Sequence, residues 1–346
     1  MKVLIAPQFG IGDALMTTPA LEVLKTNKPD WIIDVFTMKK PIMEIYQNNP
    51  NIDKVMYYPL LNKSKIQSIF YILKNISFKY DITINFFPSN RRDYNIFSFL
   101  TFSKNRLGFK YKNSSFLSFD FLLNKKIEED YNLHCVEENI RILTLLGINY
   151  KENIPNLKIY LTEEEINKGK NFLNLYNSSI KIGVHTGSSS FKSHKSKRWR
   201  KEYFLDVINY FKDFTFFLFG TEEEMEENLF IKENAKFNNA VLVADKSIRE
   251  VASIIKHLDL FISNDSGLMH LAAAVNIPVI GIFGPTNPVW VKPWGVKHKI
   301  IKINLPCSPC FYYSPKPLEC KIDEKYKCLN EIKPDKVIKA VEELLS

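Results

Sequence analysis

Short runs of apolar residues alternate with amphipathic stretches in the first half of the chain. Runs rich in β-branched and aromatic residues lie near Val3 and at 31–37, 54–57 and 81–86. The segment 14–27 has the periodicity of a helix, and a second helix-like stretch, 134–146, precedes Gly147. This alternation predicts βαβ units that build a parallel sheet.

The same alternation restarts after residues 148–157, which have weak periodicity and contain Pro155. The predicted strands of the second half begin at Ile180, Phe214, Ala240, Asp259 and Ile277. The helix-like stretches are 201–211, 222–233, 248–257 and 334–345. We therefore expect two doubly wound α/β domains, 1–155 and 156–346, with a ligand cleft between the carboxyl ends of their strands. The last helix could instead pack back on the first domain.

Composition narrows the class of protein. The chain has 346 residues, 45% of them hydrophobic, and a net charge of +9, which excludes a disordered chain and favours acidic partners. Its cysteines are odd in number and crowd the last part of the chain, which indicates a reducing cytoplasm.

The longest uncharged stretch, 266–291, is broken by Gly, Pro and Asn, and residues 1–10 lack a signal-peptide core. We expect a soluble protein, at most peripheral to the membrane.

The first candidate site is the sequence Gly10-Ile11-Gly12-Asp13, between a strand and a helix. Asp13 could simply cap the helix by accepting hydrogen bonds from amides of its first turn. Alternatively, Asp13 could lie at the ligand cleft and accept a proton from a substrate hydroxyl.

The second candidate site is the segment from Asn264 to His270, where a strand ends and a helix begins near Ser266 or Gly267. Such a helix start can hold a phosphate or pyrophosphate. The alternative is that Asp265 and Ser266 only cap the helix and that His270 is a packed core residue.

The third candidate site follows the strand that contains His185. Thr186, Gly187 and Ser188 precede a run with six Lys or Arg in positions 192–201. Together they could cradle a diphosphate and neutralise it as it leaves. A solvated basic loop, or a surface for nucleic acid or anionic lipid, is the alternative.

The fourth candidate site is a set of late cysteines, Cys307, Cys310, Cys320 and Cys328. Four thiolates could hold a structural Zn²⁺, although their intervals are irregular. The sequence contains no Asp-x-Asp pair for a nucleotide-bound Mg²⁺. A nucleotide leaving group would therefore be stabilised by helix ends and basic side chains.

Taken together, these motifs resemble those of glycosyltransferase family 9, the heptosyltransferases of lipopolysaccharide core assembly. The resemblance rests on Gly12-Asp13 followed by TTPALEVLK, K-R-W from Lys197, N-D-S-G-x-M-H from Asn264, F-G-P-T from Phe283 and the late C-x-x-C. It implies a GT-B fold, with two facing Rossmann-like domains and an interdomain cleft. The first domain would bind the acceptor and the second a nucleotide-diphosphate sugar.

The resemblance also implies roles for individual residues. Asp13 would be the general base of an inverting transfer, and Lys197 would stabilise the leaving diphosphate without a metal. The donor would contact further residues of the second domain: Thr186, Gly187, Ser188, Glu222, Asp265, Ser266, Gly267 and His270. Domain closure would assemble Asp13 against the donor. Gly12, Arg91, Arg92 and Arg106 are candidates for binding an anionic acceptor, and either Lys192 or Lys195 could replace Lys197.

The expected reaction is transfer of a sugar, with heptose from ADP-heptose favoured, to a lipopolysaccharide core or related glycan. Catalysis would need no cofactor, and the protein would act in the cytoplasm, in peripheral contact with the anionic face of the inner membrane. A nucleotide-sugar epimerase of the same fold is one alternative, distinguished by its independence of acceptor. A second alternative is a non-catalytic protein that binds nucleic acid or an anionic membrane through its basic run. We disfavour it, and expect no nucleic-acid partner, because the basic run follows a glycine turn after a strand.

Overall fold

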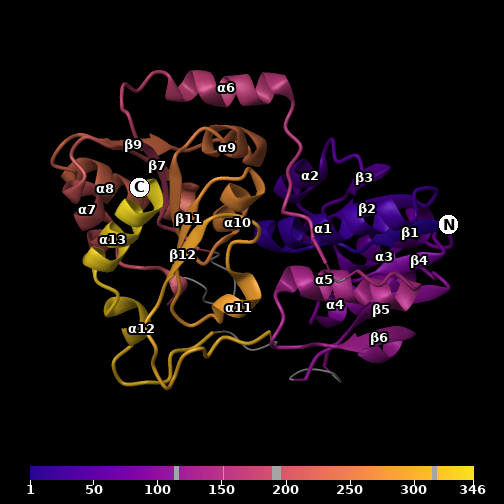
Figure 1. The fold of residues 1–346 in the computed structure, drawn as a ribbon. Coiled ribbons are helices and arrows are strands. Elements are labelled where there is room, and N and C mark those ends of the chain that lie inside the picture. The colour runs from indigo at the N-terminus through magenta and orange to yellow at the C-terminus, as the bar shows by residue number, and fades with distance from the viewer. Residues whose placement is uncertain (113–116, 151, 189–195, 314–317) are drawn as a thin grey trace. The chain divides into compact units, whose positions relative to one another are not determined.

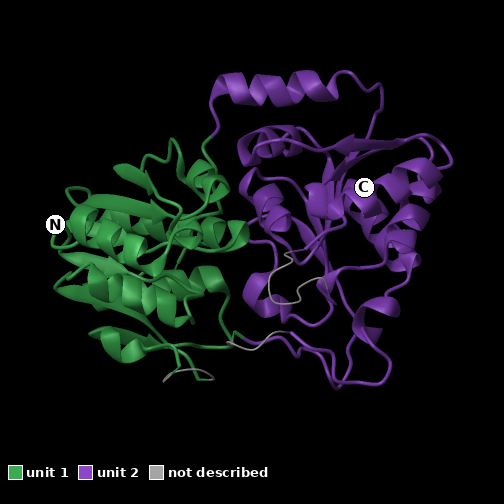
Figure 2. Cartoon of the chain, turned by 180° about the vertical axis from the view of Figure 1, so that it is seen from behind, with its two compact units in different colours: residues 1–160, 313–315 green, residues 161–312, 316–346 purple. Residues whose placement is uncertain are grey.

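The computed structural model describes residues 1–112, 117–150, 152–188, 196–313 and 318–346. The chain forms two compact units, coloured separately in Figure 2. Unit 1 comprises residues 1–160 and 313–315, and unit 2 comprises residues 161–312 and 316–346. Each unit is an α/β body with its own parallel sheet, as the alternating pattern predicts (Figure 1).

The described residues of unit 1 form a six-stranded sheet in the order β3-β2-β1-β4-β5-β6, with every neighbouring pair parallel. Its strands are β1 (Lys2–Ile5), β2 (Ile32–Thr37), β3 (Lys54–Tyr57), β4 (Ile82–Ile84), β5 (Asn105–Lys110) and β6 (Lys125–Glu128). The order reverses between β1 and β4. In a doubly wound sheet, the loops at the carboxyl ends of such a strand pair are where ligands bind.

Helices cover both faces of this sheet. They are α1 (Ile11–Asn27), α2 (Lys40–Tyr46), α3 (Lys65–Asn75), α4 (Arg92–Leu100) and α5 (Cys135–Arg141), with short 3₁₀ turns η1 (Leu60–Asn62), η2 (Asp120–Leu122) and η3 (Ile142–Leu146). α1 packs against α2 and α5, whereas α3 packs against α4. The core beneath α3 and α4 contains Leu4, Phe36, Ile72 and Phe97.

The described residues of unit 2 repeat this plan in a six-stranded parallel sheet of order β12-β11-β10-β7-β8-β9. Its strands are β7 (Lys181–His185), β8 (Thr215–Phe219), β9 (Ala240–Val243), β10 (Leu260–Asn264), β11 (Val279–Ile282) and β12 (His298–Ile301). Here the order reverses between β7 and β10. Two of the predicted motifs, at 185–188 and 264–270, therefore follow neighbouring strands at this reversal.

The helices of unit 2 are α6 (Glu163–Leu173), α7 (Lys201–Tyr210), α8 (Met225–Asn234), α9 (Ile248–Ile255), α10 (Gly267–Ala274), α11 (Pro288–Val291), α12 (Lys327–Asn330) and α13 (Pro334–Leu345), with a 3₁₀ turn η5 (Glu222–Glu224). α13 packs against α7 and the sheet. Its buried stripe, Val337, Val341 and Leu344, has the spacing of one helix face and joins the core of unit 2. In the part of the chain that the structure describes, no helix is both long and apolar enough to cross a bilayer.

Candidate functional site

In unit 1, Asp13 follows the carboxyl end of β1 and is the third residue of α1. The residue that caps the helix is Gly10, so the alternative that Asp13 is the N-cap is wrong. Gly10 lies against this carboxylate, because a Cβ atom added to it would come within 2.6 Å of Asp13 Oδ2. A side chain at position 10 would therefore displace the Asp13 carboxylate. Gly12 is buried inside the first turn.

Two cations and an aromatic ring lie beside the Asp13 loop. Lys39, two residues after β2, donates from Nζ to the Phe9 carbonyl at 3.0 Å. The Arg91 guanidinium lies 4.6 Å from the centre of the Phe9 ring. Burial lowers the pKa of Lys39, the Asp13 carboxylate opposes this effect, and Arg91 adds to it. Asp13 and Arg91 thus both act electrostatically on Lys39.

The three arginines expected to bind the acceptor have different surroundings. Arg91 joins the group around Asp13, and Arg92 is exposed as the first residue of α4. Arg106 lies near the amino end of β5, where its guanidinium donates to the carbonyls of Leu122 and Ser103. The structure therefore supports Arg91 as a site residue more than Arg106. The sequence analysis did not select Lys39. Its position just after a predicted strand could have indicated that it lies near the carboxyl ends of the strands.

Gln8 is a second residue that the sequence analysis did not single out. It lies in the loop after β1 and is 1% exposed. Neither its amide nitrogen nor its amide oxygen has a hydrogen-bond partner among the described residues. A buried amide without partners is costly, which is typical of a site that is completed by a ligand or water.

In unit 2, Asn264 connects the two strand ends at the reversal of strand order. Its side-chain nitrogen donates to the Thr186 carbonyl at 2.6 Å, and its side-chain oxygen accepts from the Trp199 backbone amide at 2.9 Å. Asn264 is fully buried. The Asn264 amide thus joins the end of β10 to the loop that follows β7.

A buried ion pair joins Lys197 and Asp265. Lys197 Nζ lies 2.7 Å from Asp265 Oδ2, and the side chains are 9% and 10% exposed. Burial raises the pKa of Asp265, but Lys197, with smaller contributions from Thr286 and His270, more than offsets this, so the pKa lies below its ordinary value. The Phe311 ring lies 4.3 Å from the same ammonium group in a cation–π contact.

Ser266 precedes α10 but its side chain does not cap the helix. The Ser266 hydroxyl lies 2.9 Å from His185 Nδ1 and 2.9 Å from the Ser263 hydroxyl. The side chains of Asp265 and Ser266 are thus engaged elsewhere, which disagrees with the alternative that they only cap α10. The first-turn amides that begin at Gly267 are of the kind that bind a phosphate at a helix N-terminus.

Both histidines of this site are buried and neutral at pH 7. Burial lowers the pKa of His185 to about 3 and, together with the nearby Arg198, disfavours the imidazolium. Burial also lowers the pKa of His270 to about 4, against the opposing effect of Asp265. His270 Nδ1 has no hydrogen-bond partner within the described part of the chain. A neutral imidazole there remains able to accept or donate one hydrogen bond to a ligand.

The buried acidic residue beside the turn at Gly187 is Glu224, not the predicted Glu222. A Cβ on Gly187 would lie 2.4 Å from Glu224 Cγ, and Glu224 Oε1 pairs with Arg198 at 2.7 Å. Arg198 also donates to the Ser188 carbonyl. Glu222 is exposed on η5 and is not part of this group. The capping-box spacing of Thr221 and Glu224 is the sequence signal that could have pointed to Glu224.

Thr186 is oriented by a side chain from α8. Its hydroxyl donates to Asn228 Oδ1 at 2.8 Å, and the Asn228 nitrogen donates to the Phe219 carbonyl at the end of β8. Lys192 and Lys195, the other lysines considered for the diphosphate, lie outside the described residues. Lys197, within them, is the lysine that joins Asp265.

The structure does not support the zinc site that the four late cysteines could have formed. Among the described residues, which include all four late cysteines, no group of three or more Cys, His, Asp or Glu is arranged to hold a metal ion. Cys328 packs in the core of unit 2, and burial raises the pKa of its thiol to about 11. The Cys320 sulfur instead accepts from the Tyr326 amide. After burial, the other three late cysteines, Cys310, Cys320 and Cys307, also raise the pKa of Cys328 by electrostatic repulsion.

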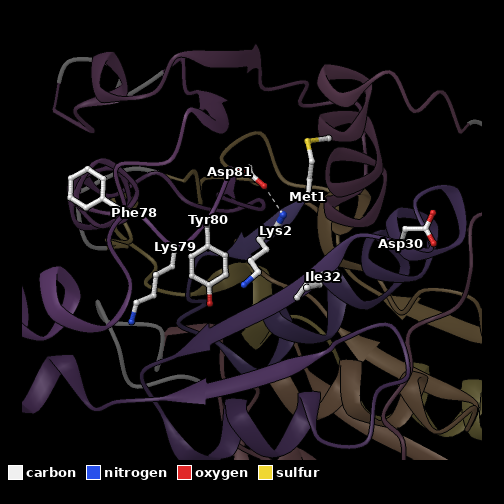
Figure 3. Close-up of a pocket in the computed structure, with 8 residues that line it drawn as sticks. All are labelled: Met1, Lys2, Asp30, Ile32, Phe78, Lys79, Tyr80 and Asp81. Atoms are coloured by element: carbon white, nitrogen blue, oxygen red, sulfur yellow. Dashed lines mark hydrogen bonds between the residues drawn. The ribbon is translucent and has the colours of Figure 1, made fainter.

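A pocket in unit 1 lies at the end of the sheet where the strands begin, opposite to the end that carries Asp13 (Figure 3). It includes Lys2 and Ile32, at the amino ends of β1 and β2, and Asp81, which precedes β4. The Asp81 carboxylate accepts from the Lys2 amide at 2.8 Å. Asp13 follows the carboxyl end of β1, so this pocket is separate from the candidate site.

The fold and the two strand reversals define an α/β protein built from two nucleotide-binding-type units. The family model "Glycosyltransferase family 9 (heptosyltransferase)" matches residues 75–321. The chain therefore belongs to glycosyltransferase family 9 and is a glycosyltransferase. This confirms the resemblance identified from the motifs.

Individual proteins similar to this chain agree with its assignment to glycosyltransferase family 9. Lipooligosaccharide heptosyltransferase 2 of Campylobacter jejuni is 30% identical over 226 residues, covering 62% of this chain and 67% of that protein. A family 9 glycosyltransferase from Veillonella parvula has a similar structure, with a TM-score of 0.78, 24% identity and coverage of 99% and 97% of the two chains. E. coli ADP-heptose lps heptosyltransferase II gives a TM-score of 0.77, 19% identity and coverage of 100% and 98%. The predicted GT-B class of fold is thereby confirmed.

Proposed function

We propose that the protein transfers a heptose from ADP-heptose to a lipopolysaccharide core acceptor, with inversion at the anomeric carbon and without a metal. The observation that carries the proposal is the buried Lys197–Asp265 pair beside the start of α10. Family membership and the ADP-heptose named for E. coli heptosyltransferase II support the choice of donor.

The donor would bind at the reversal of strand order in unit 2. Its diphosphate would accept hydrogen bonds from the first-turn amides of α10, which begins at Gly267. Lys197 would share its charge between Asp265 and the leaving diphosphate. Thr186, Ser188 and His270 would supply further polar contacts. In this account, a cation and helix amides stabilise the developing negative charge.

The acceptor would bind at the corresponding edge of unit 1. The Asp13 carboxylate would accept the proton of the attacking hydroxyl. The hydroxyl oxygen would form a bond to the anomeric carbon as the bond between that carbon and the diphosphate oxygen breaks. ADP leaves with the bonding electron pair. Lys39 and Arg91 would attract an anionic acceptor.

We place the reaction in the cytoplasm. All five cysteines are free thiols in the structure, which suits a reducing compartment. The lipopolysaccharide acceptor would bring the enzyme to the inner face of the membrane.

Calorimetric titration tests the donor assignment. The protein is titrated in EDTA with ADP-heptose and with UDP- and GDP-sugars, and we expect selective binding of ADP-heptose. Lys197→Ala should weaken that binding at least about tenfold, the size of one charge-assisted contact. Lys201→Ala is the matched control, since Lys201 belongs to the same basic run but pairs with Glu226, which is 89% exposed. Equal affinity for all three donor classes would contradict the proposal.

A further inference from the structure

The helix α3 has an apolar face that points to solvent. Ile66, Ile69, Phe70 and Leu73 are 81%, 42%, 66% and 44% exposed. Their spacing of three, four and seven residues places them on one side of the helix. The opposite side supplies the buried contacts: Ile72 lies in the core beneath, and the Tyr71 ring stacks on Tyr58 at 3.6 Å. The helix is thus anchored by one apolar face while it exposes another.

A pair of exposed aromatic rings lies in the same helical layer. Phe78 and Phe102 are 78% and 42% exposed, and their rings stack at 4.6 Å. The Phe78 amide donates to the Thr101 carbonyl, which joins the segment after α3 to the end of α4. Both phenylalanines have positive φ, 61° and 54°, a conformation that bulky residues rarely adopt. Two strained backbone positions therefore hold two large apolar rings in solvent.

Basic residues predominate around these side chains, although two acidic residues, Asp30 and Asp81, line a pocket together with Phe78. Residues 54–80 contain five lysines and no Asp or Glu, and residues 94–119 contain four basic residues and no Asp or Glu. Lys63, Lys65, Lys74, Lys79 and Lys104 are exposed. An apolar helix face bordered by lysines is the pattern of a helix that lies in the headgroup region of an anionic bilayer.

We propose that this surface, Ile66, Ile69, Phe70, Leu73, Phe78 and Phe102 with its bordering lysines, docks unit 1 on an anionic phospholipid membrane. The apolar side chains enter the headgroup boundary and the lysines contact the lipid phosphates. A second copy of the chain is a poorer occupant, because a twofold contact through this face would bring the same lysines together. The inference deepens the proposed function by assigning the surface that meets the membrane of a lipid-borne acceptor.

Vesicle co-sedimentation tests this surface without donor or acceptor. The full chain is mixed with vesicles of phosphatidylcholine alone or of phosphatidylcholine with phosphatidylglycerol. We expect binding to the anionic vesicles only, weakened by salt. Ile66→Ser/Phe70→Ser should reduce that binding at least about tenfold, since each buried apolar side chain contributes about that factor or more. Leu175→Ser is the matched control, because Leu175 is 76% exposed in unit 2.

The variants separate the possible outcomes. Because Ile66 and Phe70 are exposed, the double variant should keep the melting temperature and the ADP affinity of the parent. Lys65→Glu/Lys74→Glu should also lower binding to the anionic vesicles. Unchanged vesicle binding by the Ile66→Ser/Phe70→Ser variant would overturn the proposal, as would a dimer in solution that this variant dissociates. If the unmodified protein bound anionic vesicles but did not transfer heptose, the proposed function would be contradicted and the docking surface would not.

Discussion

Lys197 and Asp265 form a buried ion pair, with Nζ and Oδ2 separated by 2.7 Å and both side chains at most 10% exposed. The pair joins the basic run after β7 to the segment that precedes α10. A buried charge that loses its partner costs about 3–5 kcal/mol, so either residue alone affects both folding and activity. A test of function must therefore separate these two effects.

The double variant Lys197→Met/Asp265→Asn makes that separation. Each single variant should lower the free energy of unfolding, and the double variant should recover most of the loss because no unpaired charge remains. Turnover and ADP affinity should stay low in all three variants. Denaturant unfolding and calorimetric titration measure the two quantities. Recovery of turnover together with stability would show that the pair is only structural.

The Phe311 ring should hold the Lys197 ammonium group in place. Their separation is 4.3 Å, and a partly buried cation–π contact contributes about 0.5–2 kcal/mol. Phe311→Leu should therefore raise the dissociation constant for ADP about two- to thirtyfold, and Phe311→Tyr should restore it. Tyr312→Leu is the control, since Tyr312 contacts Trp290 instead. Equal effects of Phe311→Leu and Tyr312→Leu would argue against this role.

Asp13→Asn tests the base. The change keeps the size of the side chain but removes its ability to accept a proton, so kcat should fall by about 10²–10⁴ while donor affinity stays unchanged. Steady-state kinetics and titration with ADP measure this split. Asp30→Asn, at the amino edge of the same sheet, should leave both quantities unchanged. If Asp13→Asn lowered stability and kcat in proportion, the carboxylate would have a structural role.

The ion pair between Glu165 of α6 and Arg249 of α9 should give unit 2 a stability that depends on pH. The hydrogen bonds from Arg249 are the largest cause that lowers the pKa of Glu165, to about 2 from an ordinary 4.5. The stabilisation is thus complete above about pH 4.5 and is lost as the pH falls towards 2. Glu165→Gln should destabilise the fold at pH 7, and its difference from the parent should shrink over that range.

Denaturant unfolding at several pH values measures this difference. Glu164→Gln is the control, because Glu164 pairs with Lys168 on the surface and its side chain is 77% exposed. The control should stay close to the parent at every pH. A Glu165→Gln deficit that is constant down to pH 2 would contradict the assignment.

The sequence predicts the strands and helices of each unit well where apolar periodicity is strong. The strand at 54–57 and the helix at 334–345 have the predicted bounds. The start of α1 is less well predicted, because Gly10 rather than Asp13 precedes its first turn. No helix was predicted at 65–75, where the structure has α3, and its spacing alone would not have shown whether its apolar face is buried or exposed.

The site was predicted only in part for a similar reason. Motif residues such as Lys197 and Asp265 are recognisable by type, and the structure brings them together. Tertiary packing brings three further residues to the carboxyl ends of the strands, Lys39 and Gln8 in unit 1 and Glu224 in unit 2. Spacing along the chain does not reveal such contacts. The cysteines show the converse, because close spacing in sequence did not produce a metal-binding geometry among the described residues.

The most direct test is transfer itself. The protein is incubated in EDTA with ADP-heptose and a lipopolysaccharide acceptor that lacks heptose, and the product is analysed by mass spectrometry and by NMR of the new anomeric centre. We expect addition of one heptose, release of ADP, and an anomeric configuration opposite to that of the donor. Retained configuration, a requirement for added metal, or turnover of ADP-heptose that needs no acceptor would contradict it.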